Sequence, residues 1–293
     1  MSTAHPLRGA ALCLTAVLLF ACMDATTKYL VAHYGVPLVM AVRYLGNLLL
    51  MVLVLGPTEG RRMAETQRTG LVLVRAAALA CASLFFGLAV MHLPVAEATA
   101  INFLAPLLVV LAAGRLLKED VGLAGWLVAL LGLGGVLLIA RPASGLDPLG
   151  VALALCAACS NAIYQLLSRI LATTERTVAM LFYTALTGSI LFSLSAPWFY
   201  DGRVPSAFEA LLLASLGVYG GAGHFLFTAA FREAPASLIA PFGYFQLLWA
   251  GLLGWAVFGH LPDGLSLLGM AVIAGSGAIV AVRSGRPPVK RTA

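Results

Sequence analysis

Apolar residues occupy most of the chain in long stretches, and short polar segments separate these stretches. The stretches cover residues 9–31, 37–55, 70–91, 94–114, 122–140, 148–170, 177–199, 207–231, 235–259 and 264–282. Most approach or exceed about 20 residues, which is the length an α-helix needs to cross the hydrocarbon core of a membrane. The pattern therefore predicts an all-α integral membrane protein with ten transmembrane helices.

One sequence motif occurs twice along this pattern. Residues 21–28 read ACMDATTK, and residues 158–165 read ACSNAIYQ. Aligned on the motif, the first five predicted helices map onto the last five, which divides the chain into repeats at 1–142 and 143–293. Because five is odd, the two repeats would enter the membrane from opposite sides. Such inverted repeats are typical of secondary transporters, which bind their solute near the membrane midplane and work by alternating access.

Basic residues are distributed unevenly between the two predicted membrane faces. Of the 18 Lys and Arg residues, only Arg141 and Arg203 fall in loops on one face, while Lys28, Arg43 and Arg75 fall inside predicted helices. All others lie on the face that holds both termini. The positive-inside rule places that face in the cytoplasm, and we expect a multi-pass protein of the cytoplasmic (inner) membrane.

The composition narrows the class of protein further. The chain is 61% hydrophobic and 10% charged, whereas soluble domains are about one quarter charged. Its five cysteines lie within apolar stretches and indicate no disulfide framework. The sequence contains no G-x-x-x-x-G-K-[ST] phosphate-binding motif and no cluster of catalytic or metal-binding side chains. We therefore expect no enzyme activity, no cofactor, no metal and no nucleic-acid partner.

Charged residues inside the predicted helices are candidates for function, because such groups face a partner or a water-filled cavity. Asp24 and Lys28 are four residues apart on one helical face and could pair. Arg43 would lie at the same depth as Asp24, about 10 Å below the outer surface, and is a second expected partner of Asp24. Glu97 is close to that surface. These four either form a structural lock between the helices, or they gate the outer mouth or bind a zwitterion. Arg75 is expected to extend toward the cytoplasm.

The second repeat carries uncharged side chains where the first carries charges. Asn161, Gln165 and Tyr183 replace the acid and two bases of the first repeat, and Tyr164 lies beside them. We expect these polar groups, together with His224 after a glycine-rich stretch, to face the solute pathway.

Two predicted helices contain residues that interrupt a helix near the membrane midplane. One reads AINFLAP at 100–106 and contains Asn102 and Phe103; the other reads APFGYFQLLWAG at 240–251 and contains Tyr244, Gln246 and Trp249. Broken helices in a membrane are tolerated only against protein or a cavity. These five residues are therefore predicted to form the wall of a largely apolar solute pocket.

The sequences GVPLVMAVRY at 35–44 and GAGHFLFTAAFREAPASLIAPFGYFQLLWAGLLGWAVFGHLP at 221–262, with the five-plus-five repeat, resemble the drug/metabolite transporter superfamily. In particular, the chain resembles its EamA-type ten-helix carriers. The resemblance assigns the helix-2 arginine to Arg43, the Ala-Pro turn to Ala234 and Pro235, and an acidic loop residue to Glu119. His260 departs from the acidic residue that the family pattern has there.

The resemblance implies a secondary transporter of small organic metabolites. The aromatic pocket and the mixed charges favour export of amino acids, including aromatic ones; uptake of riboflavin or S-adenosylmethionine is the alternative. A channel or a membrane-embedded enzyme is a further alternative that the scattered polar residues disfavour. Expected partners are the solute and the lipid bilayer, with protons as the candidate coupling ion and the chain as a monomer or weak homo-oligomer.

Overall fold

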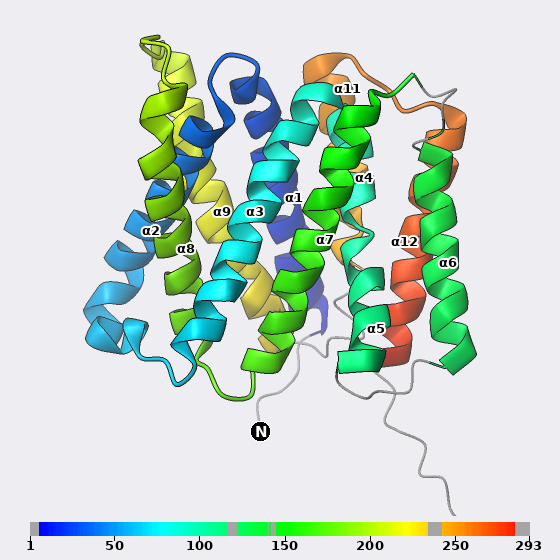
Figure 1. The fold of residues 1–293 in the computed structure, drawn as a ribbon, viewed down its shortest axis with the longest axis horizontal. Helices are drawn as coiled ribbons and strands as arrows, with labels where there is room; N and C mark the ends of the chain where they lie inside the picture. The colour runs from blue at the N-terminus through cyan, green and yellow to red at the C-terminus, as the bar shows by residue number, and fades with distance from the viewer. Residues whose placement is uncertain (1–5, 117–121, 140, 142–144, 234–241, 285–293) are drawn as a thin grey trace, which may run out of the picture.

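The computed structural model describes residues 6–116, 122–139, 141, 145–233 and 242–284, and every regular element in this part is helical. The α-helices are α1 (Pro6–Val31), α2 (Val36–Glu59), α3 (Thr69–His92), α4 (Val95–Asn102), α5 (Ala105–Leu116), α6 (Gly122–Ile139), α7 (Pro148–Leu171), α8 (Thr177–Ser195), α9 (Ala207–Glu233), α11 (Phe245–Phe258) and α12 (Gly264–Ser284). Two short 3-10 helices are η1 (Gly60–Ala64) and η3 (Ala196–Phe199). They pack side by side in one bundle (Figure 1), so the predicted all-α fold is confirmed.

Six of the described helical segments are long and apolar enough to cross a membrane. They are Leu7–Val31, Val36–Ala64, Thr69–His92, Pro148–Leu171, Thr177–Phe199 and Ala207–Phe227. Shorter apolar helices include Val95–Val109, Leu130–Ile139, Phe245–Phe258 and Gly264–Ser276. Many large apolar side chains on the outside of the bundle are exposed, as lipid contact requires. The chain is a multi-pass membrane protein.

The helix predicted at 94–114 is in fact two helices. α4 ends at Asn102 and α5 begins at Ala105, with Phe103 and Leu104 in a turn between them. Pro106 has no N–H to bond to the Asn102 carbonyl, and its ring disfavours a continuous helix at this point. The predicted helix at 235–259 is described only from 242 onward, where α11 follows a turn at Tyr244.

Helices of the first half (residues 6–139) pack mainly against helices of the second half (residues 148–284). The most extensive contacts pair α1 with α9, α3 with α7, α2 with α8, and α6 with α12. The first helix of each half thus packs against the third helix of the other half. The second helices pack against each other, and so do the last helices. Each pairing is therefore matched by its exchange between the halves, as a pseudo-twofold relation would produce.

The first helices of the two halves run in opposite directions. Lys28, near the C-terminal end of α1, contacts the C-terminal end of α3 through the Leu93 carbonyl, so α1 and α3 are parallel. Asp147, which precedes α7, contacts His92 at that same end of α3, so α7 is antiparallel to both. The start of α1 and the end of α12 lie at one end of the bundle (Figure 1).

Glycines allow two helix pairs that join the halves, α2 with α9 and α6 with α12, to approach closely. A Cβ atom on Gly217 of α9 would lie 2.7 Å from the Gly46 Cα atom of α2. On α6, a Cβ atom on Gly135 would lie 2.8 Å from the Gly269 carbonyl oxygen of α12. Small residues at both contacts serve membrane helix packing and let helices of the two halves approach each other closely.

Candidate functional site

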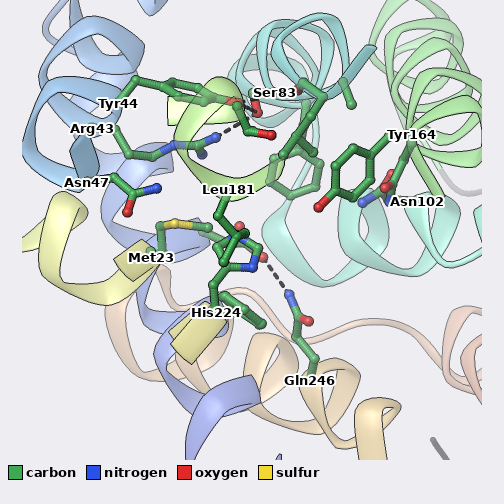
Figure 2. Close-up of a pocket in the computed structure, with 18 residues that line it drawn as sticks. Met23, Arg43, Tyr44, Asn47, Ser83, Asn102, Tyr164, Leu181, His224 and Gln246 are labelled. Carbon is green, nitrogen blue, oxygen red and sulfur yellow. Dashed lines mark hydrogen bonds between the residues drawn. The ribbon is translucent and has the colours of Figure 1, made fainter. Parts of the chain in front are cut away.

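A polar cavity of about 230 Å³ lies between the two halves of the bundle. Its walls come from α1, α2, α3 and α4 of the first half and from α7, α8, α9 and α11 of the second (Figure 2). Its polar side chains are Asp24, Arg43, Asn47, Ser83, Asn102, Asn161, Thr184, His224 and Gln246, and its aromatic side chains are Phe20, Tyr44, Phe86 and Tyr164. The lining offers hydrogen bonds and aromatic surface to a bound solute.

The two charged side chains of the cavity have separate partners. Asp24 is 7% exposed and accepts a hydrogen bond of 2.9 Å from Gln246 Nε2 (Figure 2). Arg43 donates from Nη2 to Ser83 Oγ at 2.6 Å, and the Tyr44 hydroxyl lies 2.8 Å from the same oxygen. The prediction that Asp24 pairs directly with Arg43 is therefore wrong. Each side chain forms its own hydrogen bond, although both line one cavity.

Lys28 does not pair with Asp24 as predicted. Its Nζ atom donates to the carbonyl oxygens of Val90 and Leu93, each at 2.7 Å, and lies 5.6 Å from the centre of the Phe258 ring. The last carbonyls of a helix have no intrahelical donor, and the negative end of the helix dipole attracts a cation. The C-terminal end of α3 therefore binds Lys28, and Lys28 does not line the cavity.

Glu97 also lies outside the cavity and forms a contact between the halves. It is 2% exposed in the first turn of α4, and its Oε1 atom lies 3.0 Å from His260 Nε2, just beyond α11. The four predicted charges thus do not form one cluster. The histidine that departs from the family pattern is the partner of Glu97, which is a tertiary contact that no local spacing indicates.

Arg75 is 4% exposed and does not extend toward the cytoplasm as expected. Its Nε atom donates to Ser168 Oγ at 2.6 Å, Nη1 donates to the Met180 carbonyl and to Thr184 Oγ1, and Nη2 donates to the Tyr164 hydroxyl at 2.9 Å. These partners lie on α7 and α8. Arg75 therefore connects the first half to the cavity wall of the second half.

The two predicted helix breaks meet in the structure, but they contribute only part of the wall. Asn102 and Gln246 line the cavity. The Phe103 and Tyr244 rings, whose centres are 5.1 Å apart, pack against each other and do not line it. Trp249 packs beside a small cluster of Cys13, Val17 and Ala230, away from the cavity. Pro241 of the second predicted helix break lies outside the described residues. So do Ala234, Pro235 and Glu119, to which the family resemblance assigned positions.

The remaining predicted residues divide between the cavity and its surroundings. Asn161, Tyr164 and His224 line the cavity, whereas Gln165 does not. Tyr183 points away from it, because its hydroxyl donates to the Ala64 carbonyl of η1 at 3.1 Å.

Sequence reasoning missed four polar lining residues, which are Tyr44, Asn47, Ser83 and Thr184. Asn47 lies one helical turn after Arg43, so the shared helix face could have indicated it. Ser83 aligns with His224 in the repeat, which is a second usable signal. Tyr44 and Thr184 carry no such signal. They line the cavity because of how α2 and α8 are rotated about their axes, which the sequence does not show.

Contacts between the halves close the bundle at its two ends. At the end near the start of α1, the Glu175 carboxylate accepts hydrogen bonds from the backbone N–H groups of Gln67 and Arg68, at 2.7–3.1 Å. Arg176 Nη2 donates to Glu59 Oε2 at 2.7 Å beside it. The loop between α2 and α3 is thereby tied to the turn between α7 and α8.

The opposite end has a related contact with different chemistry. Here the turn between α1 and α2 meets the loop between α8 and α9. A Cβ atom on Gly35 would lie 2.8 Å from the Phe199 Cβ atom, and the Arg203 guanidinium lies 5.2 Å from the centre of the Tyr34 ring. Arg203 is in turn held by Glu209 at 2.6 Å.

Within the ranges the structure describes, no group of three or more His, Cys, Asp or Glu side chains could hold an ion. The cavity is instead suited to an organic solute.

A helical membrane bundle with a polar cavity between two similarly paired halves is the architecture of a solute transporter. The chain belongs to the EamA-like transporter family, whose model matches it twice, at residues 7–141 and 148–282. The predicted membership of the drug/metabolite transporter superfamily is thereby confirmed.

Relatives of this chain include transporters named for their solutes. The chain is 30% identical over 283 residues to a riboflavin transporter of Vibrio cholerae, with 94% of this chain and 93% of that protein covered. It is 29% identical over 181 residues to an S-adenosylmethionine uptake transporter of Rickettsia bellii, with 61% of each covered. A crystal structure of a protein with 23% identity matches with a TM-score of 0.69 over 96% of this chain and 99% of that one, which shows the shared fold.

Proposed function

We propose that this chain is a secondary transporter that takes up riboflavin or a similar heteroaromatic metabolite by alternating access. The observation that carries the proposal is the cavity between the halves, where aromatic rings lie beside amide, hydroxyl and charged groups. The similarity to the riboflavin transporter of Vibrio cholerae over nearly the whole chain supports this solute over the amino-acid export that the sequence favoured.

The lining matches the chemistry of such a solute. Riboflavin has a flat aromatic ring system with carbonyl and ring-nitrogen acceptors and one N–H donor at its edge, and a chain of hydroxyl groups. Phe20, Tyr44, Phe86 and Tyr164 offer aromatic surface. The amides of the lining offer both donors and acceptors to the edge, which gives discrimination against rings that lack those groups.

We infer from the size of the cavity that the described conformation is a closed one. Its volume is about 230 Å³, below the roughly 300–1,000 Å³ of typical small-molecule pockets. Both ends of the bundle are held by contacts between the halves. We infer that opening one end separates the halves there and widens the cavity for the solute.

The two halves would act as inverted five-helix repeats with both termini in the cytoplasm. The opposite directions of α1 and α7 and the exchange of helix pairings support this arrangement. Labelling of single cysteines in intact cells should then place residues 60–68 and the C-terminal tail inside and residues 141–147 outside. Finding the tail and residues 141–147 on one side would contradict it.

Transport is tested with purified protein in proteoliposomes. We expect saturable uptake of labelled riboflavin and accelerated exchange when unlabelled riboflavin is inside, which a channel would not show. Liposomes without protein are the control, and S-adenosylmethionine and phenylalanine serve as competitors. Competition by phenylalanine alone, without riboflavin uptake, would favour amino-acid export instead.

Proton coupling is a separate part of the proposal. Asp24 and His224 line the cavity, and Glu97 contacts His260 toward the outer end. We expect an inwardly directed proton gradient to raise the initial rate of uptake. Equal rates with and without an imposed pH difference would indicate facilitated diffusion.

A further inference from the structure

Arg75 is a buried cation whose partners among the described residues are hydroxyl and carbonyl groups and no carboxylate. It is 4% exposed, and its four hydrogen bonds go to two hydroxyls of α7, one carbonyl of α8 and one hydroxyl of α8. Within the described ranges, no acidic side chain forms an ion pair with it. A buried charge is costly unless hydrogen bonds or an opposite charge stabilise it, so these four bonds determine where Arg75 can lie.

The hydrogens of its three hydroxyl partners can be followed individually. Ser168 Oγ donates its own hydrogen to the Tyr164 carbonyl at 2.6 Å. Thr184 Oγ1 donates to the Met180 carbonyl at 2.7 Å. The Tyr164 hydroxyl accepts from Arg75 Nη2 at 2.9 Å, and its own hydrogen has no acceptor in the part of the chain that the structure describes.

A guanidinium group contains only donors, so Tyr164 cannot donate back to Arg75. The guanidinium also lies 4.4 Å from the centre of the Tyr164 ring, which fixes the ring as well as the oxygen. The Tyr164 hydroxyl points toward the middle of the cavity (Figure 2). Its hydrogen is therefore available to a solute there, and the adjacent positive charge makes it a stronger donor.

We infer that Arg75 is a positioning residue that makes Tyr164 a hydrogen-bond donor to the transported solute. The solute accordingly places an acceptor, a carbonyl or carboxylate oxygen, against the Tyr164 hydroxyl. The inference rests on the proposed function, since it requires that the solute occupies this cavity. It assigns a role in solute selection to a residue that does not line the cavity.

The first test replaces the hydroxyl alone. Tyr164→Phe should raise the KM for riboflavin uptake in proteoliposomes roughly three- to tenfold, which corresponds to the loss of one hydrogen bond, with kcat nearly unchanged. Tyr29→Phe is the matched control, because it removes a tyrosine hydroxyl of α1 that does not line the cavity. A KM in Tyr164→Phe within twofold of the wild-type value overturns the inference.

The second test asks whether Arg75 acts through Tyr164. Arg75→Lys keeps the charge and loses the planar group that holds several partners at once. As a single variant it should therefore raise the KM. It should add little in the Tyr164→Phe background, because the hydroxyl that it positions is gone. Effects that multiply in the double variant show independent roles and overturn the inference.

Folding and the proposed function are separated from this result by two comparisons. Size-exclusion profiles report folding, and if Arg75→Lys does not fold, Tyr164→Phe decides alone. Wild-type protein without saturable riboflavin uptake refutes the proposed function and this inference with it. Uptake by the wild type that Tyr164→Phe leaves unchanged refutes the inference only.

Discussion

Replacement of Glu175 should shift the protein between the closed and open states that we propose. Glu175 is 7% exposed, and its carboxylate accepts hydrogen bonds from the backbone N–H groups of Gln67 and Arg68 at the N-terminal end of α3. Because it comes from the other half of the chain, opening this end of the bundle must break the contact. Glu175→Gln removes the charge and turns an amide N–H₂ group toward one of the donors.

The expected size of the effect follows from these contacts. Hydrogen bonds to a charged group contribute about 1.5–3 kcal/mol, against about 0.5–1.5 kcal/mol for neutral ones. A carboxylate at a helix N-terminus gains further from the helix dipole. Replacing it by an amide should therefore destabilise the closed end by about 2 kcal/mol, which changes the ratio of open to closed protein roughly 30-fold.

The shift can be measured as accessibility of the cavity. Leu181, which lines the cavity on α8, is replaced by cysteine in a chain without its native cysteines. A membrane-impermeant maleimide added from the predicted cytoplasmic side should then react faster in Glu175→Gln. Glu59→Gln is the control, because its ion pair with Arg176 is partly exposed and should contribute about 0–1 kcal/mol. Equal labelling rates for Glu175→Gln and its parent, with a lowered Tm, would show that the contact is only structural.

Three further predictions concern stability. Lys28→Met leaves the Val90 and Leu93 carbonyls without their donor and should cost about 1–3 kcal/mol, seen as a lower Tm and lower yield. Asp24→Asn keeps an oxygen that accepts a hydrogen bond from Gln246 and should have nearly the wild-type Tm, whereas Asp24→Leu should have a lower Tm. An equally lowered Tm in both variants would point to an ion pair of Asp24. The Leu149 backbone N–H, with His92, holds the pKa of Asp147 below its ordinary value of 3.8. Asp147 therefore stabilises the fold above that pH, and the Tm difference from Asp147→Asn should shrink as the pH falls through the folded-state pKa.

The fold was largely predictable because its signals are local. Long apolar stretches give helix positions directly, and the predicted 148–170 and 70–91 agree closely with α7 and α3. The division of 94–114 into two helices had a signal in Pro106, whose missing N–H ends the hydrogen-bond ladder. Ten complete spans remain a prediction for the parts of the chain outside the described residues.

The partners of the polar residues were harder to predict, because they depend on how each helix is rotated and which helix faces it. Asp24 and Lys28 are suitably spaced to pair, yet Gln246 and the end of α3 bind them instead. Arg75 was expected to extend toward the cytoplasm, but it donates hydrogen bonds to four acceptors of the other half. Such contacts join residues far apart in the sequence, and no spacing within one helix indicates them.

The repeat itself explains why only one copy of the motif is charged. Asp24 and its repeat equivalent Asn161 both line the cavity, as do Ser83 and His224, so equivalent positions of the two halves face one cavity. Two identical walls would hold an asymmetric solute equally well in two orientations. Asp24 and Arg43 both belong to the first half, and the described cavity residues of the second half include no Asp, Glu, Lys or Arg. The charges therefore make the walls unequal, and we expect them to hold the solute in one orientation while the halves move around it.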